Sequence, residues 1–166
     1  MPTITLNKKD VLKLIGKPIS DKILSLQIPM LGTDLEEITK DEIKVEIFPN
    51  RPDLLSEEGF ARALSQFLGI KTGLKKYEVN SSNYKFSQSP KTKKIRPYAV
   101  TAVIKNIKFT EDSLISLMNL QEKLHITHGR NRKRVSIGVY DLDKIKFPLT
   151  YTTKHPSFKF QPLESS

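Results

Sequence analysis

The stretch "FPNRPDLLSEEG", residues 48 to 59, places Asn50 and Arg51 between two prolines, after a strand-like run and before a helix-like one. Each proline fixes its own φ at about −65° and pushes the residue before it into an extended conformation. The backbone is therefore stiff on both sides of Arg51, and a strand-to-helix corner is expected here. Asp53, just after the second proline, can accept hydrogen bonds from the free N–H groups of the following helix.

Two roles are open for this corner. Asn50, Arg51 and Asp53 can form a hydrogen-bonded structural corner in which Arg51 pairs with an acid. Alternatively, the rigid backbone presents Arg51 or Asn50 to another subunit or to an RNA phosphate, which a guanidinium binds well. The sequence leaves both interpretations open.

The elements on either side of the corner are well marked. "DEIKVEIF" puts Ile43, Val45 and Ile47 on one face and charged residues on the other, which predicts a half-buried strand. "SEEGFARALSQFLGI" has helical apolar spacing, with Ser56 as its expected N-cap and Gly69 as its end.

The chain before the corner contains three further short elements. Residues 3–7 alternate like a strand, and residues 8–15 have the pattern of a helix that Gly16 ends. Ser20 can cap a second helix that runs as far as Pro29. These elements and the helix after the corner form a first unit that closes near residue 70.

The chain after residue 70 begins with a polar stretch. Residues 71–97 are read as a linker or crossover with two short strand candidates, "KKYEVN" and "NYKFS". Residues 98–109, "YAVTAVIKNIKF", are predicted to be a strand because they are rich in β-branched and aromatic residues.

A helix and a further strand are expected next. Thr110 is the expected N-cap of a helix that ends at Gly129. Its expected apolar stripe consists of Leu114, Leu117, Met118 and Leu124. "VSIGVYDL", residues 135–142, is predicted to be a strand, and the residues after Lys146 alternate in places.

Strands and helices are mixed without a regular βα alternation, which favours the α+β class. The expected organisation is a small α+β domain over residues 1–70, the linker over 71–97, and the start of a larger mixed α/β domain over 98–166. A helix that divides two strands is consistent with such a start.

Charge is distributed unevenly along the chain. Residues 1–70 hold 9 Lys and Arg against 11 Asp and Glu, a net charge of −2, whereas residues 71–166 hold 19 against 7, a net charge of +12. Such asymmetry points to a polyanionic partner, nucleic acid first. The alternative is a lysine-rich surface that keeps the protein soluble.

Composition also narrows the classes of site. Cysteine is absent, which removes disulfides, thiolate zinc sites and cysteine nucleophiles. The sequence has no run of about 18 apolar residues and no apolar segment after its N-terminus, so neither a membrane span nor a secretory signal is expected. These features suit a cytoplasmic protein.

The segment "HGRNRKR" is the strongest binding candidate. Arg130, Arg132, Lys133 and Arg134 follow a helix end within five positions, and guanidinium forks suit phosphate oxygens. Contacts of this kind would be largely independent of sequence. The alternative is a solvated loop whose arginines pair with the acids of "DLDK", residues 141–144.

Candidates for catalysis or metal binding are few. His125 and His128 share one helix face, with Glu122 one turn before His125, but favourable interaction with the helix dipole explains the imidazoles equally well. Asp141 and Asp143 would share a strand face and are more simply paired with neighbouring cations. Ser136 has no base near it in sequence. We therefore assign no catalytic residue and no metal ligand.

Four segments together resemble one known family. They are "MPTITLNKKDVLKLIGK", "FPNRPDLLSEEGFARALSQFLGI", "IRPYAVTAVIKNIKFTEDSLISLMNLQEKLH" and "HGRNRKRVSIGVYDLDKI". In this order they are similar to the N-terminal region of the phenylalanyl-tRNA synthetase beta subunit of the archaeal and eukaryotic type. Members of that family carry an Asn-Arg-Pro-Asp-like corner before such a helix.

The resemblance implies a subunit of a ligase that joins phenylalanine to its tRNA with ATP and Mg²⁺. It also implies an alpha subunit as partner, in an assembly of two alpha and two beta chains. Aminoacylation belongs to the alpha subunit in this family. The beta subunit contains an editing domain that hydrolyses tyrosine wrongly attached to the tRNA.

Family beta subunits are much longer than this chain. The resemblance covers the first small domain and only the beginning of the editing domain, without the later region that supplies the magnesium-binding carboxylates. Neither ATP nor Mg²⁺ is therefore expected to bind this segment. Two alternatives are a freestanding hydrolase that edits mischarged tRNA in trans and a general RNA-binding module.

Overall fold

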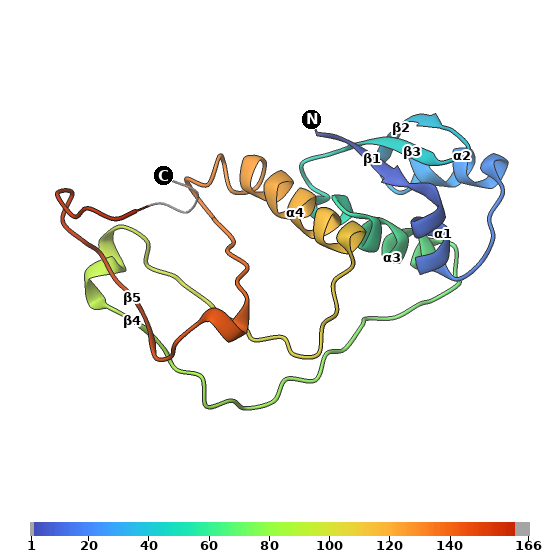
Figure 1. Cartoon of the computed structure of the whole chain (residues 1–166). Coiled ribbons are helices and arrows are strands. Elements are labelled where there is room, and N and C mark those ends of the chain that lie inside the picture. The colour runs from blue at the N-terminus through green and yellow to red at the C-terminus, as the bar shows by residue number, and fades with distance from the viewer. Residues whose placement is uncertain (1, 162–166) are drawn as a thin grey trace. The chain divides into compact units, whose positions relative to one another are not determined.

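The computed structural model describes residues 2–161, and its elements divide between two compact units (Figure 1). The first unit combines Met1–Lys76 with Lys108–Gly138, and the second combines Tyr77–Ile107 with Val139–Ser166. The structure thus groups the helix after residue 110 with the N-terminal elements, whereas the sequence suggested a boundary near residue 70. Helices and strands are mixed along the chain, so the α+β class is confirmed.

The first unit is built on a three-stranded antiparallel sheet in the order β1-β3-β2. Its strands are β1 (Thr3–Asn7), β2 (Thr33–Ile38) and β3 (Glu42–Ile47). In the central strand Ile43, Val45 and Ile47 are buried while Glu42 and Lys44 are exposed, so the predicted alternation is confirmed.

Helices cover one side of this sheet. They are α1 (Lys8–Ile15), α2 (Asp21–Met30), α3 (Glu57–Phe67) and α4 (Glu111–Ile126). The predicted N-caps Ser20, Ser56 and Thr110 each accept a backbone N–H of their helix, and Gly16 ends α1 at φ +80°. Local capping chemistry therefore fixes these helix limits, with α2 continuing one residue past Pro29.

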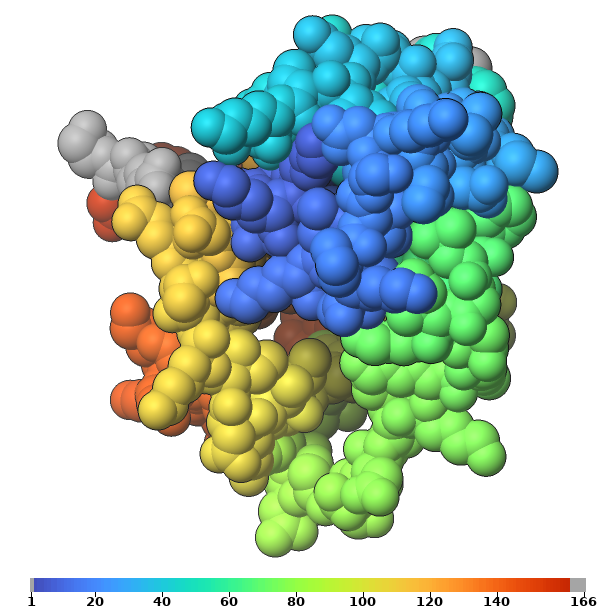
Figure 2. Space-filling model, turned by 90° about the vertical axis from the view of Figure 1, so that its right-hand side faces the viewer, coloured from blue at the N-terminus to red at the C-terminus, as the bar shows by residue number. Residues whose placement is uncertain are grey.

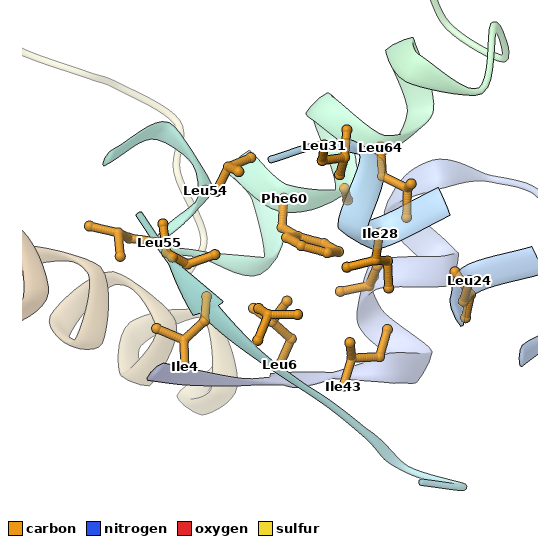
Figure 3. Packing of buried hydrophobic residues seen from close by; sticks show 14 of the residues in the cluster. Ile4, Leu6, Leu24, Ile28, Leu31, Ile43, Leu54, Leu55, Phe60 and Leu64 are labelled. Atoms are coloured by element: carbon orange, nitrogen blue, oxygen red, sulfur yellow. The ribbon is translucent and has the colours of Figure 1, made fainter. Parts of the chain in front are cut away.

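The core lies between the sheet and these helices. In Figure 3, Phe60 of α3 points toward the strands that carry Leu6 and Ile43, with Ile28 of α2 beside it. Leu120 and Leu124 of α4 pack against the same cluster. Leu114 and Met118, which the sequence placed in the apolar stripe, are 45% and 60% exposed instead. The buried face of α4 is therefore confined to its second half. The space-filling view in Figure 2 shows α1 in blue and the chain near the start of α4 in yellow.

The second unit has little regular structure. Its two strands, β4 (Phe86–Gln88) and β5 (Leu149–Tyr151), pair in parallel. The 3-10 turn η2 (Pro90–Lys94) follows β4, and the side-chain amide of Gln88 donates to Thr92 and to the carbonyl of Pro97. The rings of Tyr84 and Phe147 lie 4.8 Å apart.

Three strand predictions are wrong. The structure describes no strand at residues 75–80, 98–109 or 135–142. A strand is stable only when a neighbour satisfies its backbone groups, and within residues 2–161 no ladder forms at these segments. As a result Tyr98, Val100 and Ile104 are 90%, 96% and 73% exposed.

One strand was not predicted. The segment "TDLEEI" of β2 is largely acidic, and a register shift between Leu35 and Glu37 breaks its alternation. The strand lies at an edge of the sheet, where exposed charged residues are tolerated. In the described part of the chain, no helix is both long and apolar enough to cross a membrane.

Candidate nucleic-acid interface

Helix α4 positions the basic segment that the sequence singled out. Thr110 and Ser113 form a reciprocal capping box at its start. The hydroxyl of Ser116 lies 3.1 Å from a carboxylate oxygen of Glu57, in the first turn of α3. Together with the apolar contacts of its second half, these bonds hold α4 on the core, so its C-terminal end has a defined place.

The residues after α4 form a compact turn rather than an open loop. Arg130, Asn131 and Arg132 all have positive φ, between 49° and 64°. Their N–H groups bond back to the carbonyls of Thr127, Ile126 and His125, at 3.1, 3.3 and 3.0 Å. We call residues 127–134 the basic turn. Left-handed conformations cost energy for residues with a side chain, and here these backbone bonds stabilise them.

Gly129 is required at the start of the basic turn for reasons of space. A Cβ atom at this position would lie 2.5 Å from the carbonyl oxygen of Val135 and 2.7 Å from that of His125. Both obstructing atoms belong to the backbone and cannot rotate away. Any other residue would therefore push the turn off the end of α4.

Polar side chains of α4 fix the basic turn and the segment after it. Glu122 forms an ion pair with Arg132, and its carboxylate lies 3.7 Å from Nδ1 of His125. Nε2 of His125 accepts the N–H of Ile137 at 2.7 Å, and the side-chain amide of Gln121 donates to the Ile137 carbonyl at 2.8 Å. Side chains of α4 thus hold both the basic turn, through Arg132, and the segment after it, through Ile137.

The cations of the basic turn are not equivalent. Arg130, Arg132, Lys133 and Arg134 are all exposed. Arg132 forms an ion pair with Glu122 on α4. Within residues 2–161, the guanidinium groups of Arg130 and Arg134 make neither a hydrogen bond nor an ion pair. A rigid backbone with two unengaged guanidinium groups suits phosphate, because the backbone that carries them needs no further ordering on binding.

The backbone of the basic turn does not itself offer an anion site. Its N–H groups from Gly129 to Arg134 all donate to carbonyls of α4 or of the turn. A nest of free N–H groups, which binds anions in many phosphate sites, is therefore not formed here. Any anion would be held by side chains.

The proline-flanked corner directs Arg51 inward. Its Nε and one terminal nitrogen donate to the two oxygens of Asp53, each at 3.0 Å, and the other terminal nitrogen donates to the Leu31 carbonyl at 2.8 Å. Leu31 is the C-cap of α2, so the guanidinium ties the end of that helix to the corner. Asn50 is exposed at the tip of the turn.

The electrostatics of the corner follow from this pair. The hydrogen bonds to Asp53 raise the pKa of Arg51, and those from Arg51 lower the pKa of Asp53, against a smaller opposing effect of burial. Asp53 does not cap the following helix as the sequence suggested. It sits in the 3-10 turn η1 (Pro52–Leu54), and the side chain of Ser56 caps α3.

The other titratable candidates have structural surroundings. His125 is 3% exposed, whereas His128 is exposed at the edge of the basic turn. The two aspartates do not share a strand face, because they belong to the 3-10 turn η3 (Leu142–Lys144). Asp141 caps that turn by accepting the N–H of Asp143 at 3.1 Å. Residues 2–161 contain no group of three or more His, Cys, Asp or Glu side chains that could hold a metal ion.

An apolar pocket beside the corner was not anticipated from the sequence. Its volume is about 280 Å³. Its walls combine the N-terminus, the corner and the end of α4: Pro2, Ile47, Phe48, Pro49, Pro52, Leu55, Thr127 and His128. Proximity of the corner to residues 127–128 depends on tertiary packing, so no local pattern could have revealed it.

Comparison with known proteins agrees with the fold. Residues 1–70 match the family model described as the Phe-tRNA synthetase beta subunit B1 domain. The beta subunit of phenylalanine–tRNA ligase from Methanosarcina barkeri is 48% identical over 165 residues, which is 99% of this chain and 30% of the relative. The corresponding subunit from Archaeoglobus fulgidus is 46% identical over 164 residues, with the same shares.

A solved structure is similar over nearly the whole chain. It is an N-terminal fragment of the phenylalanyl-tRNA synthetase beta subunit from Pyrococcus horikoshii, with a TM-score of 0.87 and 38% identity. The match covers 98% of this chain and 48% of that chain.

The first unit therefore contains an α+β domain of the B1 class. Over nearly its whole length the chain is homologous to the N-terminal region of archaeal phenylalanine–tRNA ligase beta subunits. It spans about 30% of the length of the curated relatives described above.

Proposed function

We propose that this chain is the tRNA-facing N-terminal part of a beta subunit in a ligase that attaches phenylalanine to tRNA with ATP. The observation that carries the tRNA-facing role is the basic turn, in which Arg130 and Arg134 project from a backbone clamped to α4. The net charge of +12 over residues 71–166 adds a sequence-independent attraction for a polyanion.

The catalytic and assembly functions belong to the complete ligase. The alpha subunit is the proposed partner, in an assembly of two alpha and two beta chains, and the cytoplasm is the proposed location. ATP and Mg²⁺ serve the complete ligase. We assign no step of the reaction to this segment.

Residues 98–166 are proposed to begin the domain that hydrolyses mischarged tyrosyl-tRNA. Their apolar segments, which lack pairing partners within the described residues, support this idea, because Val100 and Ile104 have the β-branched side chains that are common in sheets but remain exposed. We expect further strands from the complete subunit to pair with them. A deacylation assay with tyrosyl-tRNA specific for phenylalanine separates this proposal from a freestanding hydrolase: turnover by the 166 residues alone would favour the hydrolase.

The tRNA-facing role is tested by the salt dependence of tRNA binding. We expect the double substitution R130Q/R134Q, measured in the ligase assembled with this subunit, to reduce the slope of log K against log salt by about 1 for each phosphate that is no longer neutralised. The matched control is K13Q/K17Q, which removes the same charge from exposed positions in and just after α1. An unchanged slope in the arginine variant, or an equal reduction in the control, would contradict the proposal.

A further inference from the structure

The apolar pocket and the basic turn share one boundary. Thr127 and His128 line the pocket, and the carbonyl of Thr127 accepts the N–H of Arg130 at 3.1 Å. The first cation of the turn therefore follows directly from the pocket wall. A ligand that combines an apolar part with negative charge would meet both surfaces.

The pocket walls have the character of a stacking surface. Phe48 contributes a ring, Pro49 and Pro52 contribute two rigid pyrrolidine faces, and His128 contributes an exposed imidazole. Its described lining contains no carboxylate. Unpaired bases of RNA stack on such faces, and this stacking tolerates any base because each has a flat π-surface.

The size and rigidity of the pocket also favour a single ring system as its ligand. The volume of about 280 Å³ lies just below the range of roughly 300–1,000 Å³ that is typical of small-molecule sites. The walls change little in shape, because proline rings fix the corner and backbone hydrogen bonds fix the end of α4. A preformed cavity of this kind loses little entropy when it is filled.

We propose that this pocket binds one unstacked base of a single-stranded RNA segment, whose adjoining phosphates contact Arg130 and Arg134. The proposal rests on the tRNA-facing function proposed above and assigns it a nucleotide site. An apolar side chain of a partner protein is the competing occupant. The positive charge beside the pocket favours the nucleotide, because a guanidinium binds a phosphate more strongly than the carbonyl of a neutral peptide.

The test compares two polyanions that differ only in their bases. Fluorescence anisotropy measures binding of the 166-residue chain to a short uridine oligonucleotide and to the same sugar–phosphate backbone without bases. We expect the chain to bind the oligonucleotide about tenfold more tightly than the abasic backbone, as the stacking of one base allows.

Variants divide the two parts of the site. We expect H128A and F48A to bring the base-dependent ratio close to one. R130Q/R134Q should weaken the binding of both polyanions by the same factor and leave the ratio of the two affinities unchanged. The control L14A removes an exposed apolar side chain from α1, far from the pocket in sequence, and should change neither value. Because His128 is exposed, H128A keeps the test valid even if F48A does not fold.

Each other outcome overturns the inference. Equal binding of both polyanions by the unmodified chain would remove the base site but leave the phosphate contacts and the proposed function intact. Binding of neither would refute the proposed function as well. If F48A weakens association with the alpha subunit and leaves the base-dependent ratio unchanged, the pocket is a protein contact.

Discussion

Gly59 in the first turn of α3 offers a test in which helix propensity and packing predict opposite signs. Replacement of an interior helical glycine by alanine normally stabilises a helix by about 1 kcal/mol. In this protein a Cβ atom at Gly59 would lie 1.9 Å from the carbonyl oxygen of Asp53. To restore even a 3.0 Å separation, that carbonyl must move by at least 1.1 Å.

Such a movement would disturb the core. The displaced carbonyl precedes Leu54 and Leu55, which are 0% and 5% exposed. Overpacking of a core costs about 1–3 kcal/mol and occasionally more, and the upper part applies here because the obstructing atom belongs to the backbone. After the gain in propensity of about 1 kcal/mol is subtracted, we expect Gly59→Ala to lower the free energy of unfolding by about 1–2 kcal/mol, or the melting temperature by about 2–8 °C.

Urea and thermal unfolding, followed by far-ultraviolet circular dichroism, measure this change. The control is Asn119→Ala on the exposed face of α4, where only propensity acts and a gain of at most about 0.5 kcal/mol is expected. A Gly59→Ala variant as stable as the unmodified chain, or more stable, would show that α3 and the corner are not packed as described.

Two further predictions concern the hydrogen bonds of Arg51 at the corner and the ion pair between Glu122 and Arg132. We expect Arg51→Met to destabilise the chain by about 1–2 kcal/mol at neutral pH, mostly through the bond to the Leu31 carbonyl, because the exposed pairing with Asp53 is screened. Since the pKa of Asp53 is lowered in the folded state, the contribution of its ion pair to stability is present above about pH 4 and is lost as the pH falls through the folded pKa. Urea titrations should therefore show that the difference in free energy of unfolding between Arg51→Met and the unmodified chain becomes smaller in that pH range. A difference that does not change with pH would contradict this. We expect Glu122→Gln to release Arg132 and to speed amide hydrogen exchange in the basic turn about two- to fivefold, with almost no change in global stability. Unchanged exchange would mean that Glu122 does not hold the turn.

The helix limits could be predicted from sequence because they depend on local chemistry. Ser20, Ser56 and Thr110 each satisfy an N–H within three residues of themselves, and Gly16 adopts the left-handed conformation that ends α1. The alternation of the β3 residues is similarly local. These features need no knowledge of the rest of the fold.

The strands that failed depend on partners instead. Residues 98–109 have the composition of a strand, yet composition cannot state whether a neighbouring strand is present within the described residues. The edge strand β2 was missed for the converse reason: β3 supplies its pairing, so its acidic sequence does not need strong strand propensity. Pairing, rather than propensity, decided both cases.

The candidate site shows the same division. The sequence located the four cations of the basic turn, but it could not indicate that Arg132 is engaged by Glu122, ten residues earlier on α4. The left-handed conformation of Arg130 was also hidden, since arginine has no local preference for it. Gly129 could be recognised from the sequence as the end of the helix. Its close approach to the Val135 carbonyl could be seen only in the folded structure.

The stiffness of the proline-flanked corner has a single physical explanation with two consequences. The guanidinium of Arg51 must reach both Asp53 and the carbonyl of Leu31, and a flexible loop would lose entropy to hold that geometry. Prolines remove this freedom before folding, so the bonds form at lower entropic cost. The same rings cannot donate hydrogen bonds, which leaves the other side of the corner apolar where Pro49 and Pro52 line the pocket. One constraint on the backbone thus produces a polar clamp directed inward and an apolar surface beside the end of α4.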